Sequence, residues 1–76
     1  MKYIIFKSGH EERAVVFSSI LTHSVVAHQL GFKTQEVIAA GFVELDKEHG
    51  VRCFGKSISL HISSRFNDAS IITKEL

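Results

Sequence analysis

The chain has no proline and no tryptophan, and only one cysteine, Cys53, among its 76 residues. One cysteine cannot form an internal disulfide, whereas small secreted domains are usually stabilised by several. We therefore expect the protein to work in the reducing cytoplasm of a cell. Without proline, low-complexity tracts or repeats, nothing marks a linker, and the length suits a single domain spanning residues 1–76.

Long apolar runs and a charge excess are also missing. The apolar run Tyr3–Phe6 is far shorter than the roughly 7–15 residues of a signal-peptide core, and no run approaches the roughly 18 of a membrane helix, so we expect no membrane contact. Nine Lys and Arg face eight Asp and Glu. Proteins that follow a nucleic-acid backbone usually carry a basic excess, so only a local patch could serve that purpose here.

Hydrophobic residues make up 45% of the chain and charged residues 22%, which is typical of a folded globular protein. A chain this short buries only about 60% of the surface that its unfolded form exposes, and its core seldom yields more than about 3–5 kcal/mol. The length excludes a large enzyme fold. It also favours a homodimer or a complex with a partner protein.

Four segments rich in β-branched, aromatic and other apolar residues predict strands over 3–6, 13–18, 36–45 and 51–54. The third of these is apolar on both faces near its middle, as is typical of a central strand. One face is predicted to carry Val37, Ala39, Gly41, Val43 and Leu45, and the other Ile38, Ala40, Phe42 and Glu44. The thin stretch 39–41 would let a helix approach closely.

Two helices are expected. Thr22 is a suitable N-cap and Gly31 a suitable terminator for a helix over 22–30, with Phe32 folding back on Ala27. The second helix is predicted to start at Ser63 or Ser64. Its expected apolar stripe is Phe66, Ala69, Ile72 and Leu76.

Residues 57–62 alternate as an extended segment, either a fifth strand or the fourth continued past a bulge at Gly55. The sequence thus predicts an α+β fold of order β-β-α-β-β-(β)-α. Its antiparallel sheet would have four to five strands, with the two short helices on one face.

Three patterns suggest chemistry, and each has a simpler interpretation. Residues 50–57 match the phosphate-loop pattern G-x-x-x-x-G-K-[ST], but that loop needs a helix after it. Here the apolar residues that follow recur at every second position, which indicates an extended chain. His23 and His28 have the H-x4-H spacing of a zinc-finger histidine pair. On a helix, however, they would lie about 140° apart and could not face one zinc ion, and no C-x-x-C accompanies them. Cys53 lies two residues after Val51, on the same face of the predicted strand, and is expected to be buried there. We expect no catalytic residue, metal or cofactor, and therefore no enzyme.

The charges are unevenly distributed along the chain. Segment 36–48 carries four acids and one lysine, a net charge of −3, whereas segment 49–67 has no acid. We predict an interaction surface in this second segment, formed by Arg52, Phe54, Lys56, Ser57 and Arg65. Such a strip could contact phosphates or an acidic protein surface. Ordinary solubilising charge is the alternative.

Several short stretches resemble small uncharacterised proteins encoded by bacteriophages and prophages. They are Tyr3–Gly9, Arg13–Ser18, Ala40–Val43, Cys53–Leu60, Ser64-Arg65, Asp68-Ala69 and Ile71-Ile72. The chain has Phe66-Asn67 where that pattern often has Pro-Glu. The resemblance carries no activity and implies a bacterial or phage-infected cytoplasm.

Two functions follow as hypotheses. The first is a small non-enzymatic interaction protein that binds a host or phage protein, as an inhibitor or modulator of host machinery. The second is a nucleic-acid-binding accessory module that uses the basic strip in 49–67. Phosphate-ligand binding at residues 50–57 is a third possibility, and it would require Lys56.

Overall fold

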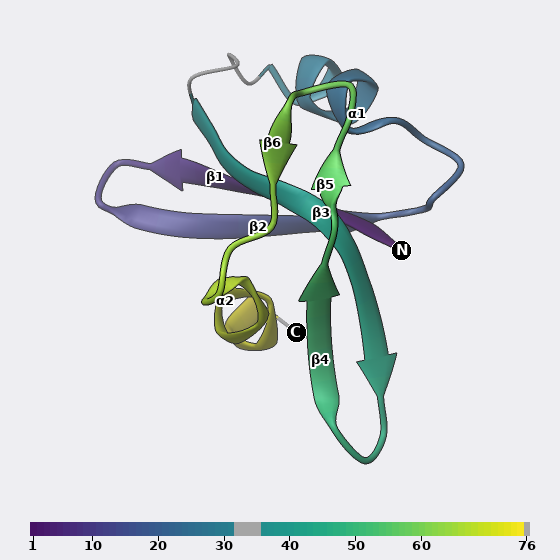
Figure 1. Ribbon diagram of the computed structural model, residues 1–76. Helices are drawn as coiled ribbons and strands as arrows, with labels where there is room; N and C mark the ends of the chain where they lie inside the picture. The colour runs from purple at the N-terminus through teal and green to yellow at the C-terminus, as the bar shows by residue number, and fades with distance from the viewer. Residues whose placement is uncertain (32–35, 76) are drawn as a thin grey trace.

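The computed structural model describes residues 1–31 and 36–75. Its main sheet is antiparallel, with strand order β2-β1-β3-β4 (Figure 1). The elements, in chain order, are β1 (Lys2–Ser8), β2 (Glu11–Phe17), α1 (His23–Gln29), β3 (Val37–Asp46), β4 (Gly50–Phe54), β5 (Lys56–Ser57), β6 (Ile62–Ser63) and α2 (Asp68–Glu75). The predicted α+β class is confirmed, and the element order matches except that two short strands, β5 and β6, in a sheet of their own take the place of the expected fifth strand. Neither described helix combines the length and apolar character needed to cross a membrane.

The centre of the sheet is β1, which pairs with β2 on one side and β3 on the other. Its residues Tyr3, Ile4 and Ile5 are fully buried. Because successive side chains of a strand point to opposite faces, Tyr3 and Ile5 lie on one face and Ile4 lies on the other. Burial on both faces requires a cover on each side of the sheet.

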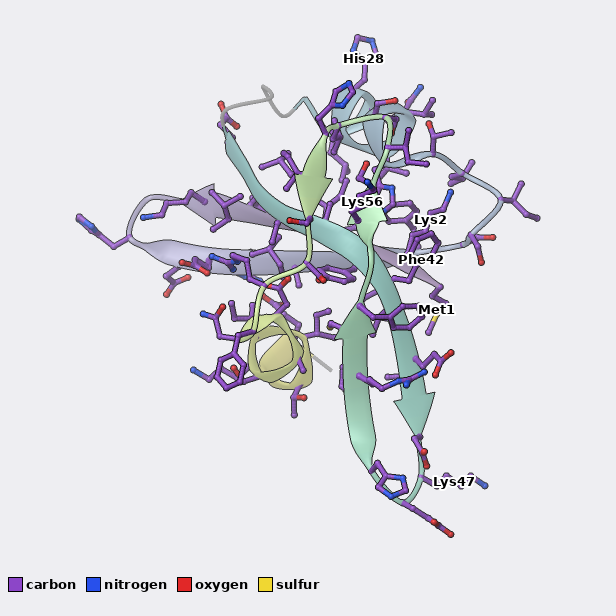
Figure 2. All side chains as sticks on the ribbon, in the orientation of Figure 1. Met1, Lys2, His28, Phe42, Lys47 and Lys56 are labelled. Atoms are coloured by element: carbon purple, nitrogen blue, oxygen red, sulfur yellow. The ribbon has the colours of Figure 1, made fainter. Side chains whose placement is uncertain are left out.

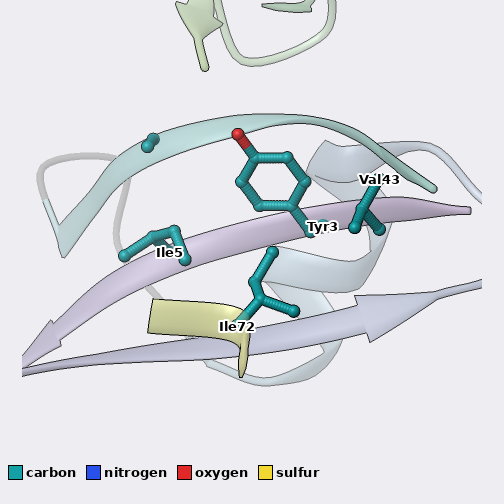
Figure 3. Close-up of a cluster of buried hydrophobic side chains, with 5 residues drawn as sticks. Tyr3, Ile5, Val43 and Ile72 are labelled. Carbon is teal, nitrogen blue, oxygen red and sulfur yellow. The ribbon is translucent and has the colours of Figure 1, made fainter. Parts of the chain in front are cut away.

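One cover is α2, whose Ile72 packs on the first face; the buried cluster there is Tyr3, Ile5, Ala39, Val43 and Ile72 (Figure 3). The other cover is α1 together with the β5–β6 hairpin; the cluster on that face is Ile4, Val26, Ala27, Val37 and Ala40, with Leu60 and Ile62 against it. The prediction that both helices lie on one face is therefore wrong. Each apolar face of β1 and β3 has a helix of its own.

A bulge changes the expected pattern of β3. Ile5 pairs with Ala39, but Phe6 pairs with Val37, so Ile38 is an extra residue in the ladder. Val37 consequently packs with Ala40 on the α1 face, whereas strict alternation placed it with Ala39. Ile38 moves to the opposite face, against the cluster under α2.

Local signals in the sequence predicted both ends of α1 correctly. The Thr22 side chain accepts a hydrogen bond from the backbone N–H of Val25 at 3.2 Å, as an N-cap does. Gly31 has a φ of +79° and ends the helix in the left-handed region. The predicted contact of Phe32 lies outside the described residues.

Residues 57–62 do not form one extended segment. They fold into a tight hairpin in which the turn 58–61 joins β5 to β6. The Ser57 hydroxyl accepts a hydrogen bond from the backbone N–H of Leu60 at 3.1 Å, and His61 takes a φ of +58°. This side-chain bond closes the turn and overrides the alternating pattern. The hairpin packs across β3 (Figure 1).

Helix α2 begins at Asp68, later than the predicted Ser63 or Ser64. The Asp68 carboxylate accepts hydrogen bonds from the backbone N–H of Arg65 at 2.7 Å and from the Arg65 side chain at 3.0 Å, so residues 65–67 form a turn before the helix. Phe66 is fully exposed in that turn and does not belong to the apolar stripe. Ile72 is fully buried, as predicted, and Leu76 lies outside the described residues.

The expected close approach at the thin stretch of β3 involves different partners. Ala39 and Ala40 do face helices, on opposite sides of the sheet. At Gly41, however, the neighbour is strand backbone. A Cβ added there would lie 2.6 Å from the carbonyl oxygen of Phe54 and 3.3 Å from Cβ of Ser64. Gly41 is therefore required for the chain leaving β4 to cross β3.

Candidate functional site

Two of the predicted interaction residues, Arg52 and Phe54, lie together at the exposed end of β4. The Arg52 guanidinium sits 5.1 Å from the centroid of the Phe54 ring. Its Nη2 also donates to the Glu44 carboxylate across the strand pair, at 2.6 Å. Arg52 thus has its charge balanced within the fold, while 39% of Phe54 remains exposed.

Arg65 lies on the other face, beside α2. It binds Asp68 through Nε and Glu12 of β2 through Nη2, at 3.0 and 2.8 Å. The Arg65 guanidinium also lowers the pKa of the Glu12 carboxyl below its usual value. Arg65 therefore joins β2 to the start of α2, and it does not extend a basic strip with Arg52.

Lys56 and Ser57, adjacent in β5, have different environments. Ser57 is buried, and its hydroxyl is occupied by the turn that follows. Lys56 is exposed, and among the described residues no carboxylate pairs with it. Of the predicted set, the structure brings Arg52 and Phe54 together and separates Ser57 and Arg65 from them.

One of the predicted residues, Lys56, lines an open hollow of about 550 Å³, which we call the aromatic hollow. Its lining comes from five parts of the chain and consists of Lys2, Thr22, His23, Phe42, Gly55, Lys56, Ile58 and Ser59. Figure 2 shows Lys2, Phe42 and Lys56 gathered on the same side of the molecule. A volume of this size is within the range of about 300–1,000 Å³ that ligand-binding sites occupy.

The Phe42 ring forms the floor of the aromatic hollow. It stacks on Phe54 with ring centroids 5.8 Å apart, and it meets the His23 ring edge-on at 6.1 Å. Gly55 passes over it with a φ of +76°, so close that an added Cβ would lie 3.0 Å from the ring. The backbone and two neighbouring rings hold Phe42 in place. A fixed aromatic surface loses little entropy when it is covered.

His23, in the wall of the hollow, is almost fully buried. Its Nε2 lies 2.8 Å from the carbonyl oxygen of Gly41, and because a carbonyl can only accept, Nε2 carries the proton. Burial lowers the pKa of His23, and the nearby Lys2 ammonium lowers it further. The imidazole is therefore neutral at physiological pH and adds no charge to the hollow.

The rim of the aromatic hollow is cationic and apolar. The Lys2 ammonium is held by a 2.9 Å hydrogen bond to the carbonyl of Leu21 and lies 6.0 Å from the Phe42 ring centroid. Lys56 follows Gly55 on the rim, and Ile58 is 79% exposed. No described Asp or Glu lines the hollow. The arrangement therefore suits a ligand that combines an apolar group with negative charge.

A second hollow lies between the β1–β2 hairpin and α2, and ion pairs already engage three of its charged side chains. Arg13 donates to Glu75 at 2.6 Å, and Glu12 accepts from Arg65. It lacks an exposed aromatic floor, because its lining is Glu11, Glu12, Arg13, Asn67, Ser70, Ile71, Lys74 and Glu75. These pairs fasten α2 to β2, so the aromatic hollow is the better candidate site.

The residues whose patterns suggested chemistry in the sequence have structural roles in the fold. Residues 50–57 contain β4 and β5, and the turn 58–61 and β6 come directly after them in place of a helix. The Cys53 thiol faces the cluster under α2, where burial raises its pKa. A raised pKa lowers the fraction of reactive thiolate. Within residues 1–31 and 36–75, no three His, Cys, Asp or Glu side chains are grouped to hold a metal ion.

Comparison with known proteins adds no relative: no family model, curated protein or solved structure matches the chain. The phage-type resemblance therefore remains a prediction. Most of the aromatic hollow could not be predicted from the sequence. Lys2, His23, Phe42 and Ile58 come from separate elements, and only Ile58 lay in the acid-free segment that drew attention.

Proposed function

We propose that this chain is a small non-enzymatic interaction protein that binds a partner protein through the aromatic hollow. The observation that carries the proposal is the stacked Phe42–Phe54 pair: Phe54 is 39% exposed, and Phe42 lines the hollow together with the exposed Ile58 and with Lys2 and Lys56. Exposed aromatic and large aliphatic side chains that cluster on a small protein are typical of protein-binding sites.

The setting follows from the resemblance to phage and prophage proteins. In this proposal the protein works in a bacterial cytoplasm, and its partner is a host or phage protein whose activity it inhibits or modulates. In this proposal it uses no catalytic residue of its own. The effect on the partner comes from occupying a surface, which is a task that a domain of 76 residues can perform.

The experiment is affinity capture from a bacterial lysate, with and without nuclease, using the wild-type chain and the double variant F54S/I58S. Phe66→Ser is the matched control, because Phe66 is fully exposed in the turn before α2 and away from the hollow. We expect a protein that survives nuclease treatment, is lost with F54S/I58S and is retained with F66S. Capture that is unchanged in F54S/I58S contradicts the proposal.

Nucleic-acid binding is the second hypothesis, and the positions of the arginines weaken it. Arg52 pairs with Glu44, and Arg65 pairs with Glu12 and Asp68, so only Lys56 of the proposed basic strip lacks a described carboxylate partner. Binding to phosphates would have to compete with these ion pairs. Captured material that disappears after nuclease treatment would favour this alternative.

We also propose that the protein is a homodimer. β2 and β4 are the outer strands of the main sheet, and sheet edges readily pair with another strand. Light scattering after gel filtration should give twice the chain mass of 8.5 kDa. A mass of one chain across the micromolar range would exclude the dimer and leave the binding proposal intact.

A further inference from the structure

The aromatic hollow has a charge pattern that defines its occupant more closely than the proposed function does. Two ammonium groups, those of Lys2 and Lys56, stand on its rim. No carboxylate of the described residues lines it, although the chain has eight Asp and Glu. The neutral His23 adds no charge. The hollow therefore presents positive charge around an apolar floor.

The other polar groups of the lining are already engaged within the protein. The Thr22 hydroxyl caps α1, and the Ser59 hydroxyl accepts from the backbone N–H of Ser24 at 3.1 Å. Lys2 is anchored by the Leu21 carbonyl, which fixes its ammonium near the Phe42 ring and leaves two of its three N–H donors. Lys2 and Lys56 are thus the groups available to a polar ligand.

The floor of the hollow sets the second requirement. The Phe42 ring, the adjoining Phe54 ring and the exposed Ile58 offer apolar area with no hydrogen-bonding atom. A strongly polar ligand would desolvate its own groups there without replacing their hydrogen bonds, which is unfavourable. An occupant must place an apolar side chain on this floor and its negative charges at the rim.

We infer that the aromatic hollow binds a segment of the partner protein in which one aromatic or large aliphatic side chain is flanked by aspartate or glutamate. The inference rests on the proposed function and specifies the chemistry of its partner. The apolar side chain covers Phe42, and the carboxylates lie against Lys2 and Lys56. Charge complementarity of this kind selects between partners and speeds their encounter.

The test is selection of a random 12-residue peptide library, displayed on beads, against the wild-type chain. We expect the enriched peptides to combine Phe, Trp, Leu or Ile with neighbouring Asp or Glu. Their affinity, measured by fluorescence anisotropy, should fall about tenfold in K2Q/K56Q and also when salt is raised from about 50 to about 300 mM.

Lys47→Gln is the matched control. Lys47 is exposed at the tip of the β3–β4 hairpin, well away from the hollow (Figure 2), so K47Q should bind like wild type. Because Lys2→Gln removes the bond to Leu21, the single variant K56Q is measured as well. It alters no described hydrogen bond and should lose part of the affinity by itself.

Two groups of results would overturn the inference, and they separate it from the proposed function. Peptides that are enriched without acidic residues, or that bind K2Q/K56Q as tightly as wild type, would refute the acidic segment while F54S/I58S still abolished binding. A library that yields no binder, together with capture unaffected by F54S/I58S, would refute both. If the library yields no binder and a single-stranded oligonucleotide binds the hollow instead, the peptide occupant is also refuted.

Discussion

The hydroxyl of Tyr3 in β1 donates a hydrogen bond to the carboxylate of Asp68 at the start of α2, at 2.5 Å, and both side chains are fully buried. Burial and this bond to the carboxylate raise the pKa of Tyr3 well above its usual value, so the hydroxyl keeps its proton. Asp68 also accepts from Arg65. One buried carboxylate thus joins the central strand, the turn before α2 and the helix itself.

Tyr3→Phe should lower the free energy of unfolding by about 1–3 kcal/mol, because the buried Asp68 carboxylate loses a donor that nothing replaces. Asp68→Ala should cost more, about 3 kcal/mol or above, since it removes the acceptor of the Tyr3 hydroxyl and one of the two carboxylates that bind Arg65. Urea unfolding followed by circular dichroism measures both. Equal stability of Y3F and wild type would show that the bond contributes nothing.

Gly41→Ala should destabilise the fold by about 3 kcal/mol, because the added methyl group would overlap the backbone carbonyl of Phe54, which cannot move without disturbing β4. Gly50→Ala is the matched comparison. Gly50 has a φ of +78° and open space around it, so alanine there costs about 1 kcal/mol, through backbone conformation alone. Thermal melts of the two variants should differ clearly, and equal losses would contradict the close approach at Gly41.

The pH dependence of stability should include a contribution from His23, whose pKa is lowered in the folded protein, mainly by burial. In the unfolded chain histidine titrates near pH 6.5. Below about that pH the unfolded chain binds the proton more readily than the folded protein does, so stability is lost until the folded pKa is passed.

Urea midpoints measured from pH 7.5 to pH 5 should therefore fall less steeply in His23→Gln than in wild type. A His23→Gln variant with an unchanged slope would refute the assignment, even if its stability is lower at every pH.

The two arginines of the predicted strip should behave differently. Arg65→Gln removes bonds to Glu12 and to the buried Asp68, so we expect a loss of about 1–2 kcal/mol. Arg52→Gln breaks an exposed pair with Glu44 and the contact with the Phe54 ring, and the expected loss is smaller, about 0.5 kcal/mol. Chemical denaturation of both variants at low and high salt tests this contrast. A loss for R52Q as large as for R65Q would contradict it.

Local signals in the sequence account for much of the fold. Thr22 and Gly31 bound α1 as expected, and the alternation in β3 identified a central strand. These features act between residues a few positions apart, so short patterns carry them. The prediction of an extended segment over 57–62 was wrong because the alternation of its residues was the only signal used. The hydrogen bond from the backbone N–H of Leu60 to the Ser57 hydroxyl stabilises a turn there instead.

By itself, the sequence determined the α+β class, the element order, the two hairpins of the main sheet and the caps of α1. The tertiary structure alone decided that α1 and α2 cover opposite faces, that Ile38 forms a bulge, and that α2 starts at the buried Asp68. It also formed the aromatic hollow, by bringing Lys2, Phe42 and Lys56 together from separate strands. The physical reason is that contacts between distant segments depend on how surfaces fit in three dimensions, and the spacing of residues along the chain does not encode that fit.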